Sequence, residues 1–295
     1  MERLLGIGFI VISATAFGAV PLFANVAYRE GMTPVSVLFL RFSIAAVVLL
    51  CLTTIKKRSF PSGKILLLLI LMGAVGYAGQ SFSYFTALRF APSGLVSVLL
   101  YIYPALVAGL SFLVLKQSIP RVKLFALLLS LAGIPFTIGL KFGSQSLGIL
   151  LAILAAMIYS VYIIIGTKVT RETDILVSST IIITSAGVIY GSYIAWKGLS
   201  FPATSVGWGA IFGLALISTV IAVLMFFEGL KRIGPVDASM LSTLEPVVTV
   251  GLAWRFMGER LTMMNMFGGL MILAAAILLA RYETKPTDEY KLLKK

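Results

Sequence analysis

The sequences Tyr-Pro-Ala-Leu-Val-Ala-Gly at residues 103–109 and Glu-Pro-Val-Val-Thr-Val-Gly at residues 245–251 decide the fold of this 295-residue chain. Each places a proline and a glycine at the same depth of a long apolar segment, and the two segments lie 142 positions apart. The same offset aligns, without a gap, Gly6 with Gly148, Phe17 with Tyr159, Ser36 with Ser178, Leu88 with Leu230, Arg89 with Lys231, Ser97 with Ser239 and Phe125 with Phe267. We therefore expect two repeats, at residues 1–140 and 141–295, with a polar tail at the end of the second.

The composition is that of an integral membrane protein. Hydrophobic residues make up 59% of the chain and charged residues 12%, about half the roughly 25% usual in soluble domains, and the mean hydropathy is +1.04. A helix needs about 20 apolar residues to cross a bilayer. Ten runs approach this length, at residues 4–24, 35–54, 65–88, 94–115, 124–140, 147–166, 175–196, 208–230, 238–256 and 263–280.

Each repeat holds five of these runs. An odd number of crossings inverts the second repeat relative to the first, which is the plan of secondary transporters that bind their substrate between two inverted halves. The sequence therefore predicts an all-α membrane protein with ten transmembrane helices in two inverted five-helix repeats.

Lysine and arginine residues predict the orientation, because cytoplasmic loops carry an excess of them. Seventeen fall in loops on the side of the termini and six on the opposite side, and Arg41, inside a span, completes the total of 24. We expect a multi-pass protein of the cell (plasma) membrane with both termini in the cytoplasm.

This chain lacks the residues that several classes of function require. The chain has no histidine and a single cysteine, Cys51, so we expect no bound metal, no cofactor and no intramolecular disulfide. We find no nucleophile with a base, and no phosphate-binding loop of an ATP-driven pump. The net charge of +13 is spread over loops, so a nucleic-acid partner is not expected. Nothing resembles the repeated filter loop of a channel.

Pro104 and Pro246 predict breaks in the fourth and ninth spans. A proline removes one helical hydrogen bond and frees a carbonyl, which lipid cannot satisfy. Matched breaks in two inverted halves point to a central substrate site. A simple packing kink is the alternative at each position.

Two charged residues lie deep in the predicted spans. Glu245 is roughly 10 Å from the cytoplasmic end of its helix, and Arg41 is about 9 Å from the opposite end of its own. Charges at such depth are costly and are commonly functional. Glu245 is predicted to bind substrate or exchange a proton, with a structural hydrogen bond as the alternative. Arg41 is predicted either to contact substrate or to extend toward the outer head groups.

Polar and aromatic side chains are candidates for lining the same cavity. They are Asn25, Tyr77, Gln80, Tyr84, Tyr101, Tyr103, Tyr159, Ser160, Tyr162 and Trp254. Aromatic residues near span ends commonly belong to the interfacial belt. Tyr77, Tyr101 and Tyr103 lie deeper, where a buried hydroxyl needs a hydrogen-bond partner.

Other residues have simpler interpretations. Glu228 is expected at the membrane interface, with the transport pathway as the alternative. Asp237 is expected to be a helix N-cap. Gly73, Gly76 and Gly79 give the third span a smooth face suited to close helix packing.

The chain resembles the EamA-type transporters of the drug/metabolite transporter superfamily over its entire length. The resemblance rests on residues 244–248, Leu-Glu-Pro-Val-Val, with 258–261, Gly-Glu-Arg-Leu, and on their first-half counterpart 103–106, Tyr-Pro-Ala-Leu. It also includes Pro34 with Arg41, and Ala-Leu-Arg-Phe at 87–90. The resemblance implies a ten-helix carrier of small metabolites, often an exporter of amino acids. The chain departs from the family after its fourth span, where Lys116-Gln117 replaces a common glutamate.

We therefore expect a secondary transporter that exports small metabolites such as amino acids by alternating access. Its expected partners are a small-molecule substrate and the lipid bilayer, and a monomer is sufficient although a homodimer is compatible with the sequence. A carrier of drugs, sugar phosphates or nucleotide sugars, a channel-like protein and a lipid-handling protein are the alternatives. Phosphorylated cargo would be expected to meet more positive charge than Arg41 alone supplies.

Overall fold

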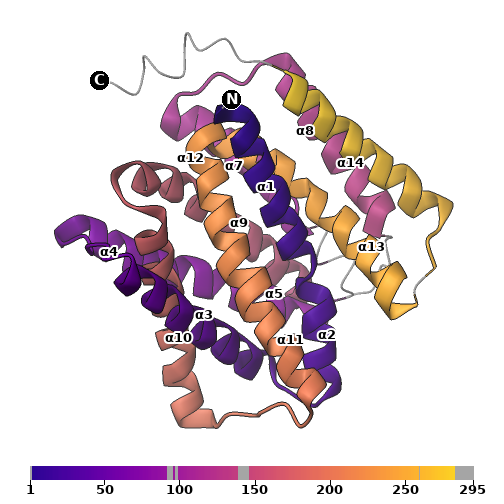
Figure 1. Ribbon diagram of the computed structural model, residues 1–295. Helices are drawn as coiled ribbons and strands as arrows, with labels where there is room; N and C mark the ends of the chain where they lie inside the picture. The colour runs from indigo at the N-terminus through magenta and orange to yellow at the C-terminus, as the bar shows by residue number, and fades with distance from the viewer. Residues whose placement is uncertain (1, 92–95, 97–98, 139–145, 259, 283–295) are drawn as a thin grey trace.

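The structure is a computed structural model (Figure 1) that describes residues 2–91, 96, 99–138, 146–258 and 260–282, except the side chains of residues 88, 89, 138 and 171. Within these residues the chain forms helices joined by turns and short loops, and it contains no strand. Residues 139–145, Glu259 of the motif at 258–261 and the expected polar tail beyond residue 282 lie outside this part of the chain.

Two similar series of helices follow one another along the chain. The first comprises α1 Glu2–Gly18, α2 Val20–Arg29, α3 Pro34–Ile55, α4 Gly63–Leu71, the π-helix η1 Met72–Tyr77, α5 Ala78–Phe90, α7 Tyr103–Leu115 and α8 Arg121–Ile138. The second comprises α9 Ser146–Glu172, α10 Ile175–Lys197, α11 Ser205–Ala215, the π-helix η2 Leu216–Ile221, α12 Ala222–Leu241, the 3₁₀ helix η3 Ser242–Leu244, α13 Glu245–Met257 and α14 Met263–Arg281.

Seven helical stretches among the described residues are long and apolar enough to span a membrane. They are Glu2–Arg29, Pro34–Ile55, Gly63–Ala87, Ser146–Thr170, Ile175–Lys197, Ser205–Met257 and Met263–Arg281. The stretch of 53 residues contains two of the predicted spans and changes direction at Gly234, whose φ of 78° is a conformation that suits glycine. The protein is therefore a multi-pass, all-helical membrane protein, and the count of ten spans stays a prediction.

The first span differs from the expected segment 4–24. The helix is interrupted at Ala19 and continues to Arg29 as α2, with Pro21 in its first turn. Proline fits a first helical turn because the N–H that it lacks has no partner inside the helix there. The helical stretch Glu2–Arg29 is thus longer than the expected span, and the interruption before Pro21 divides it into two parts.

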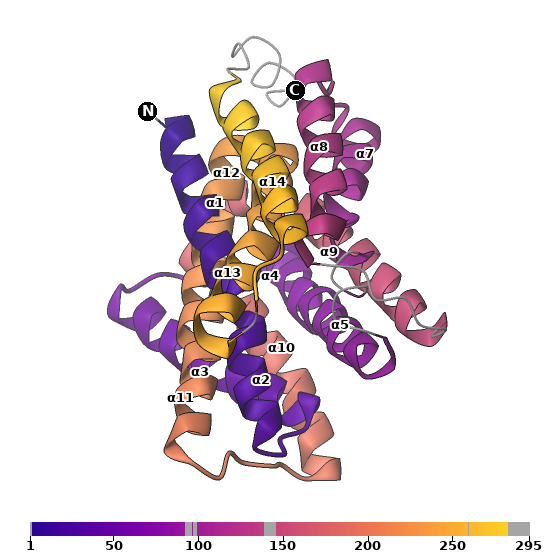
Figure 2. The same cartoon turned by 90° about the vertical axis from the view of Figure 1, so that its right-hand side faces the viewer.

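Helices of the two series pack in pairs. Helix α1 lies along α12, α5 along α9, α3 against α10 and α8 against α14 (Figures 1 and 2). In the repeat, α1 corresponds to α9 and α12 to α5, so the pair α1–α12 is the counterpart of the pair α5–α9. The other two pairs each join two corresponding helices, α3 with α10 and α8 with α14. The packing thus has the form expected of a chain with an internal repeat.

The two π-helices occupy corresponding places, since η2 begins and ends 144 residues after η1. In η1, a Cβ atom on Gly73 would overlap the carbonyl oxygen of Ile182 in α10. Gly76 and Gly79 instead face Tyr162 and Ile158 of α9. The glycines therefore serve close helix packing, as their plain interpretation predicted.

A buried ion cluster joins four helices at the end of the molecule where α1 begins and α14 ends, the terminus end. Asp237 of α12 lies 2.7 Å from the Lys123 amine of α8 and 3.3 Å from the Arg3 guanidinium of α1. Arg3 also donates to the carbonyls of Leu279 and Tyr282, each at 2.8 Å. The expectation that Asp237 is an N-cap is wrong, because the helix restarts at Gly234, three residues earlier.

Hydrogen bonds between loops join the two series at the opposite end. The Thr33 N–H donates to the Ser200 hydroxyl at 3.2 Å, and the Ser200 N–H donates to the Ser36 hydroxyl at 3.1 Å. The Glu30 carboxylate accepts from the Ala203 N–H at 2.8 Å and from both the N–H and the hydroxyl of Thr204, the residue that caps α11. These bonds fix the loop after α2 against the loop after α10.

Candidate functional site

Five tyrosines contributed by both series form a continuous row, which we call the tyrosine row. Successive ring centroids lie 6.3 Å apart for Tyr101 and Tyr103, 4.7 Å for Tyr103 and Tyr159, 6.0 Å for Tyr159 and Tyr162, and 5.8 Å for Tyr162 and Tyr77. These separations fall in the range of favourable aromatic pairs. The structure thus brings five of the predicted site residues together.

The two deep charges of the sequence stand at opposite ends of the tyrosine row. The Tyr101 hydroxyl donates to the Glu245 carboxylate at 3.2 Å. At the other end, the Arg41 guanidinium donates to the Tyr77 hydroxyl at 3.3 Å. The row therefore connects a half-buried carboxylate to a buried cation across the packed halves of the chain.

Both prolines lie at the start of a helix next to the row. Pro104 is in the first turn of α7 and Pro246 is in the first turn of α13, and both are buried. Before Pro246 the chain passes through η3, so Glu245 becomes the first residue of α13. The predicted breaks thus set the direction of the segments that carry Tyr101, Tyr103 and Glu245.

Arg41 does not extend toward the head groups, and this alternative is wrong. Its side chain is buried, with 3% of the residue exposed. Its Nε donates to the Thr219 hydroxyl at 2.5 Å, and a terminal nitrogen donates to the Ser218 carbonyl at 2.8 Å as well as to Tyr77. The acceptors on η1 and η2 explain why the guanidinium turns inward.

The other predicted lining residues occupy different surroundings. Gln80 is half-buried and accepts a hydrogen bond from the Ser81 hydroxyl at 3.3 Å. Tyr84 is half-buried with its ring edge-to-face against Phe85, at 5.8 Å between centroids. Ser160 donates to the carbonyls of Ala156 and Tyr103, and Asn25 is half-buried in α2.

Trp254 does not belong to the tyrosine row. It is 54% exposed on the outer surface of α13, and the expectation that it lines the cavity is corrected. Glu228 is half-buried near the terminus end and pairs with Arg232, one helical turn later. That pairing agrees with its expected interfacial position.

Ser218 and Thr219, the partners of Arg41, were missed because no motif marks them in the sequence. The repeat offset of 142 nevertheless aligns Thr219 with Tyr77, and both residues bind the same guanidinium. Phe226 and Phe227 were also missed. They pack against Tyr159 and Tyr162, with centroids 6.3 and 5.9 Å away.

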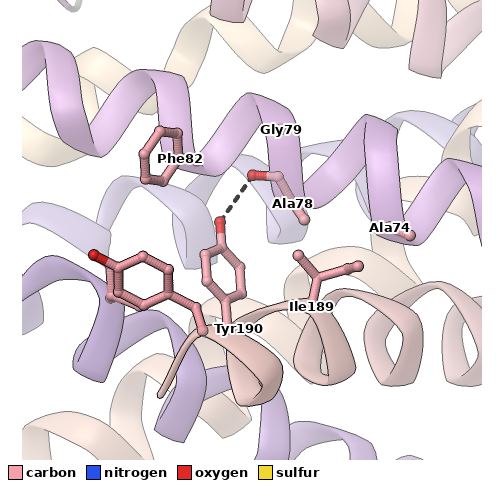
Figure 3. A pocket seen from close by; sticks show the side chains of 8 residues that line it. Ala74, Ala78, Gly79, Phe82, Ile189 and Tyr190 are labelled. Carbon is pink, nitrogen blue, oxygen red and sulfur yellow. Dashed lines mark hydrogen bonds between the residues drawn. The ribbon is translucent and has the colours of Figure 1, made fainter. Parts of the chain in front are cut away.

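The described part of the chain has two notable hollows, and neither is lined by a tyrosine of the row. A mostly apolar cavity of about 230 Å³ lies between the third span and α10, and its lining includes Ala78, Gly79, Phe82, Ile189 and Tyr190 (Figure 3). There the Tyr190 hydroxyl donates to the Ala78 carbonyl at 2.8 Å. A second hollow of about 520 Å³ at the terminus end is lined by Glu2, Asp174, Ile175, Glu228, Lys231 and Arg232. Within the described residues, no group of three or more acidic or cysteine side chains is arranged to hold a metal ion.

A family model and several curated proteins match this chain. The family model described as the EamA-like transporter family matches residues 4–139 and, 142 residues further along, residues 146–281. The uncharacterized transporter YcbK of Bacillus subtilis is 24% identical over 90% of both chains. An uncharacterized transporter of Archaeoglobus fulgidus is 26% identical over 91% of this chain and 94% of its own, and the protein PecM of Dickeya dadantii is 26% identical over 79% and 86%.

A solved crystal structure of a protein has the same fold. It superposes with a TM-score of 0.77, covers 94% of this chain and 95% of its own, and shares 20% sequence identity. At that identity the likeness concerns the arrangement of helices alone.

Proposed function

This chain belongs to the EamA-like transporter family, and from that premise we propose that it is a secondary carrier that exports small metabolites such as amino acids. Its family and relatives are membrane transporters and not enzymes. We propose further that ten spans form two inverted repeats in the plasma membrane, with both termini in the cytoplasm. The excess of basic residues in the loops on the side of the termini supports this orientation.

The tyrosine row carries the proposal for the substrate site. Tyr77, Tyr101 and Tyr103 come from the first half of the chain and Tyr159 and Tyr162 from the second, with Arg41 and Glu245 at the two ends of the row. Its origin in both halves supports a substrate site at the row, because carriers built from two inverted repeats bind substrate between the halves. Alternating access would open it to each side in turn. A monomer provides every residue of the row.

The chemistry of the row favours a substrate that carries an ammonium group. Glu245 is half-buried, and among the residues that the structure describes no cation pairs with it. A positively charged amine would satisfy this carboxylate and would also be attracted to the faces of the neighbouring tyrosine rings. Amino acids and cationic drugs both carry such a group.

Phosphorylated cargo fits the row less well. A sugar phosphate or nucleotide sugar needs cationic donors, and Arg41 already donates to Thr219, Ser218 and Tyr77. This arrangement supports amines over phosphates among the cargo classes.

The decisive experiment is counterflow in proteoliposomes that contain the purified protein. Vesicles loaded with unlabelled amino acids are given labelled threonine, phenylalanine or a methylated amine at two pH values. Accelerated entry of a labelled compound would establish a carrier. Absence of entry for all three, with protein shown to be folded, would overturn the amine assignment and direct the search to phosphorylated metabolites and lipids.

Glu245→Gln tests the role of the carboxylate in the same vesicles. The amide keeps the hydrogen bond from Tyr101 but loses the charge, so binding of an amine should weaken. Trp254→Phe is the control, because its side chain lies on the outer surface. Normal transport by Glu245→Gln across the pH range would remove Glu245 from the site.

A further inference from the structure

Both π-helices are held by hydrogen bonds that cross from one half of the chain to the other. A π-helix departs from the regular i→i+4 pattern, and such bulges are frequent at functional sites and helix bends. The Ala78 carbonyl, directly after η1, accepts from the Tyr190 hydroxyl at 2.8 Å. Ala222, directly after η2 and 144 residues later, accepts from the Ser13 hydroxyl at 2.8 Å. Each π-helix is therefore followed by a carbonyl that accepts a hydrogen bond from a side chain of the other half.

Arg41 differs from these two donors because it binds residues of both π-helices at once. Its guanidinium reaches Tyr77 at the end of η1, and Ser218 and Thr219 in the middle of η2. Its equivalent at the offset of 142 is Ile183, which carries no polar group. Arg41 is thus a single bridge and has no counterpart in the second half.

The bonding of Arg41 differs from that expected of a substrate ligand. Three acceptors already surround the guanidinium. One of them, the Thr219 hydroxyl, itself donates to the Leu214 carbonyl at 2.8 Å. The guanidinium also lies over the Phe42 ring, 5.2 Å from its centroid. A buried charge satisfied in this way loses several bonds if it turns toward a ligand, and such a loss is costly.

We infer that Arg41 is a positioning residue that ties the two π-helices together, so that η1 in the third predicted span and η2 in the eighth move as one unit during transport. The inference rests on the proposed function for its role in transport, but the physical tie itself does not. Because Arg41 binds the end of the tyrosine row through Tyr77, the tie also links occupancy of the row to the two π-helices.

Segment-resolved hydrogen–deuterium exchange tests the tie without any knowledge of the cargo. Hydrogen bonds to charged groups are strong enough that losing one should raise local opening by about tenfold. Arg41→Lys keeps the charge but loses the planar fork, so exchange should rise in both Met72–Tyr77 and Leu216–Ile221. Thr15→Val is the control, because that hydroxyl bonds the Val11 carbonyl of its own helix.

Two milder variants test separately the bond of Arg41 to η1 and its bond to η2. Tyr77→Phe should raise exchange mainly in η1 and Thr219→Val mainly in η2, because each removes one acceptor and keeps the shape of the side chain. A rise confined to one π-helix in Arg41→Lys, or no rise in either, would overturn the inference. Because these variants are conservative, a loss of folding in Arg41→Lys alone still leaves Tyr77→Phe and Thr219→Val to decide it.

Transport kinetics then distinguish positioning from substrate contact. With any cargo that the wild type moves, Arg41→Lys should lower the maximal rate by about tenfold while the KM changes less than about threefold. A large rise in KM at an unchanged maximal rate would make Arg41 a substrate ligand and refute the inference. If the wild type moves no cargo, the proposed function fails while the exchange experiment still reports on the tie.

Discussion

Replacing Asp237 by asparagine should destabilise the protein strongly, because it leaves two cations without their shared partner. Asp237 is 3% exposed and Lys123, 2.7 Å away, is 6% exposed, so water screens the pair little. Breaking a buried ion pair on one side costs about 3–5 kcal/mol of unfolding free energy. Arg3, the second cation, is half-exposed and adds less.

The matched control is Asp174→Asn. Asp174 lies 3.6 Å from the Arg58 guanidinium, with side chains 36% and 54% exposed, and its other oxygen caps α10. Asparagine keeps the capping ability, and an exposed pair of this kind contributes about 0–1 kcal/mol. The same chemical change should therefore cost several-fold less at Asp174 than at Asp237.

Denaturant-induced unfolding of the purified protein in mixed micelles measures both variants against the wild type. The double variant Asp237→Asn with Lys123→Met should recover much of the loss, because it removes the stranded charge and keeps an apolar stem. Equal effects of Asp237→Asn and Asp174→Asn, or no recovery in the double variant, would refute the reasoning from burial.

The remaining predictions concern the site, the loops and the helix packing. Glu245→Gln should lower counterflow of amine cargo by about tenfold or more, as expected when a charged contact is lost, and an unchanged rate at every pH would contradict this. Hydrogen bonds from the Thr204 hydroxyl and from backbone N–H groups lower the pKa of Glu30 below its ordinary 4.5. The stability that Glu30 contributes is therefore present above pH 4.5 and is lost as the pH falls through the lowered pKa. The difference in unfolding temperature between the wild type and Glu30→Gln should shrink on acidification. A difference that stays constant with pH would contradict this prediction. Gly73→Ala should destabilise the protein because its Cβ meets the Ile182 carbonyl, whereas Gly209→Ala, with open space around the Cβ, should be neutral or stabilise by up to about 1 kcal/mol; equal unfolding midpoints would refute this difference.

The repeat and the apolar segments allowed the helical membrane class to be predicted, because each segment must satisfy its backbone within itself. The ends of the segments were harder to predict. Pro21 lies inside one apolar run, and hydropathy alone does not show that the helix restarts there and continues to Arg29. The π-helices have no signal in the apolar pattern, since one added residue leaves the composition of a span unchanged.

The site was predicted in part. All five tyrosines were candidates for the cavity lining, and three of them, Tyr77, Tyr101 and Tyr103, were singled out because a deeply buried hydroxyl needs a partner. The structure groups the five in one row. Trp254 was misplaced because apolar residues occur on every side of α13, so the sequence does not tell the lipid face from the inner face. The direction of Arg41 depends on acceptors from Tyr77 and η2, which are distant in sequence, and depth in a span gives no information about them.

The two halves have prolines at equivalent helix starts but different residues at the charged positions of the site. The prolines at 104 and 246 occupy equivalent positions and start equivalent helices. At the same offset, Glu245 corresponds to Tyr103, and Arg41 to Ile183. Two similar halves can provide matched helix starts and π-helices, but a substrate with one ammonium group needs a carboxylate on one side only. Because Glu245 has no acidic counterpart and Arg41 is already occupied, the charged end of the substrate should bind on the Glu245 side of the tyrosine row, away from the tie between the π-helices.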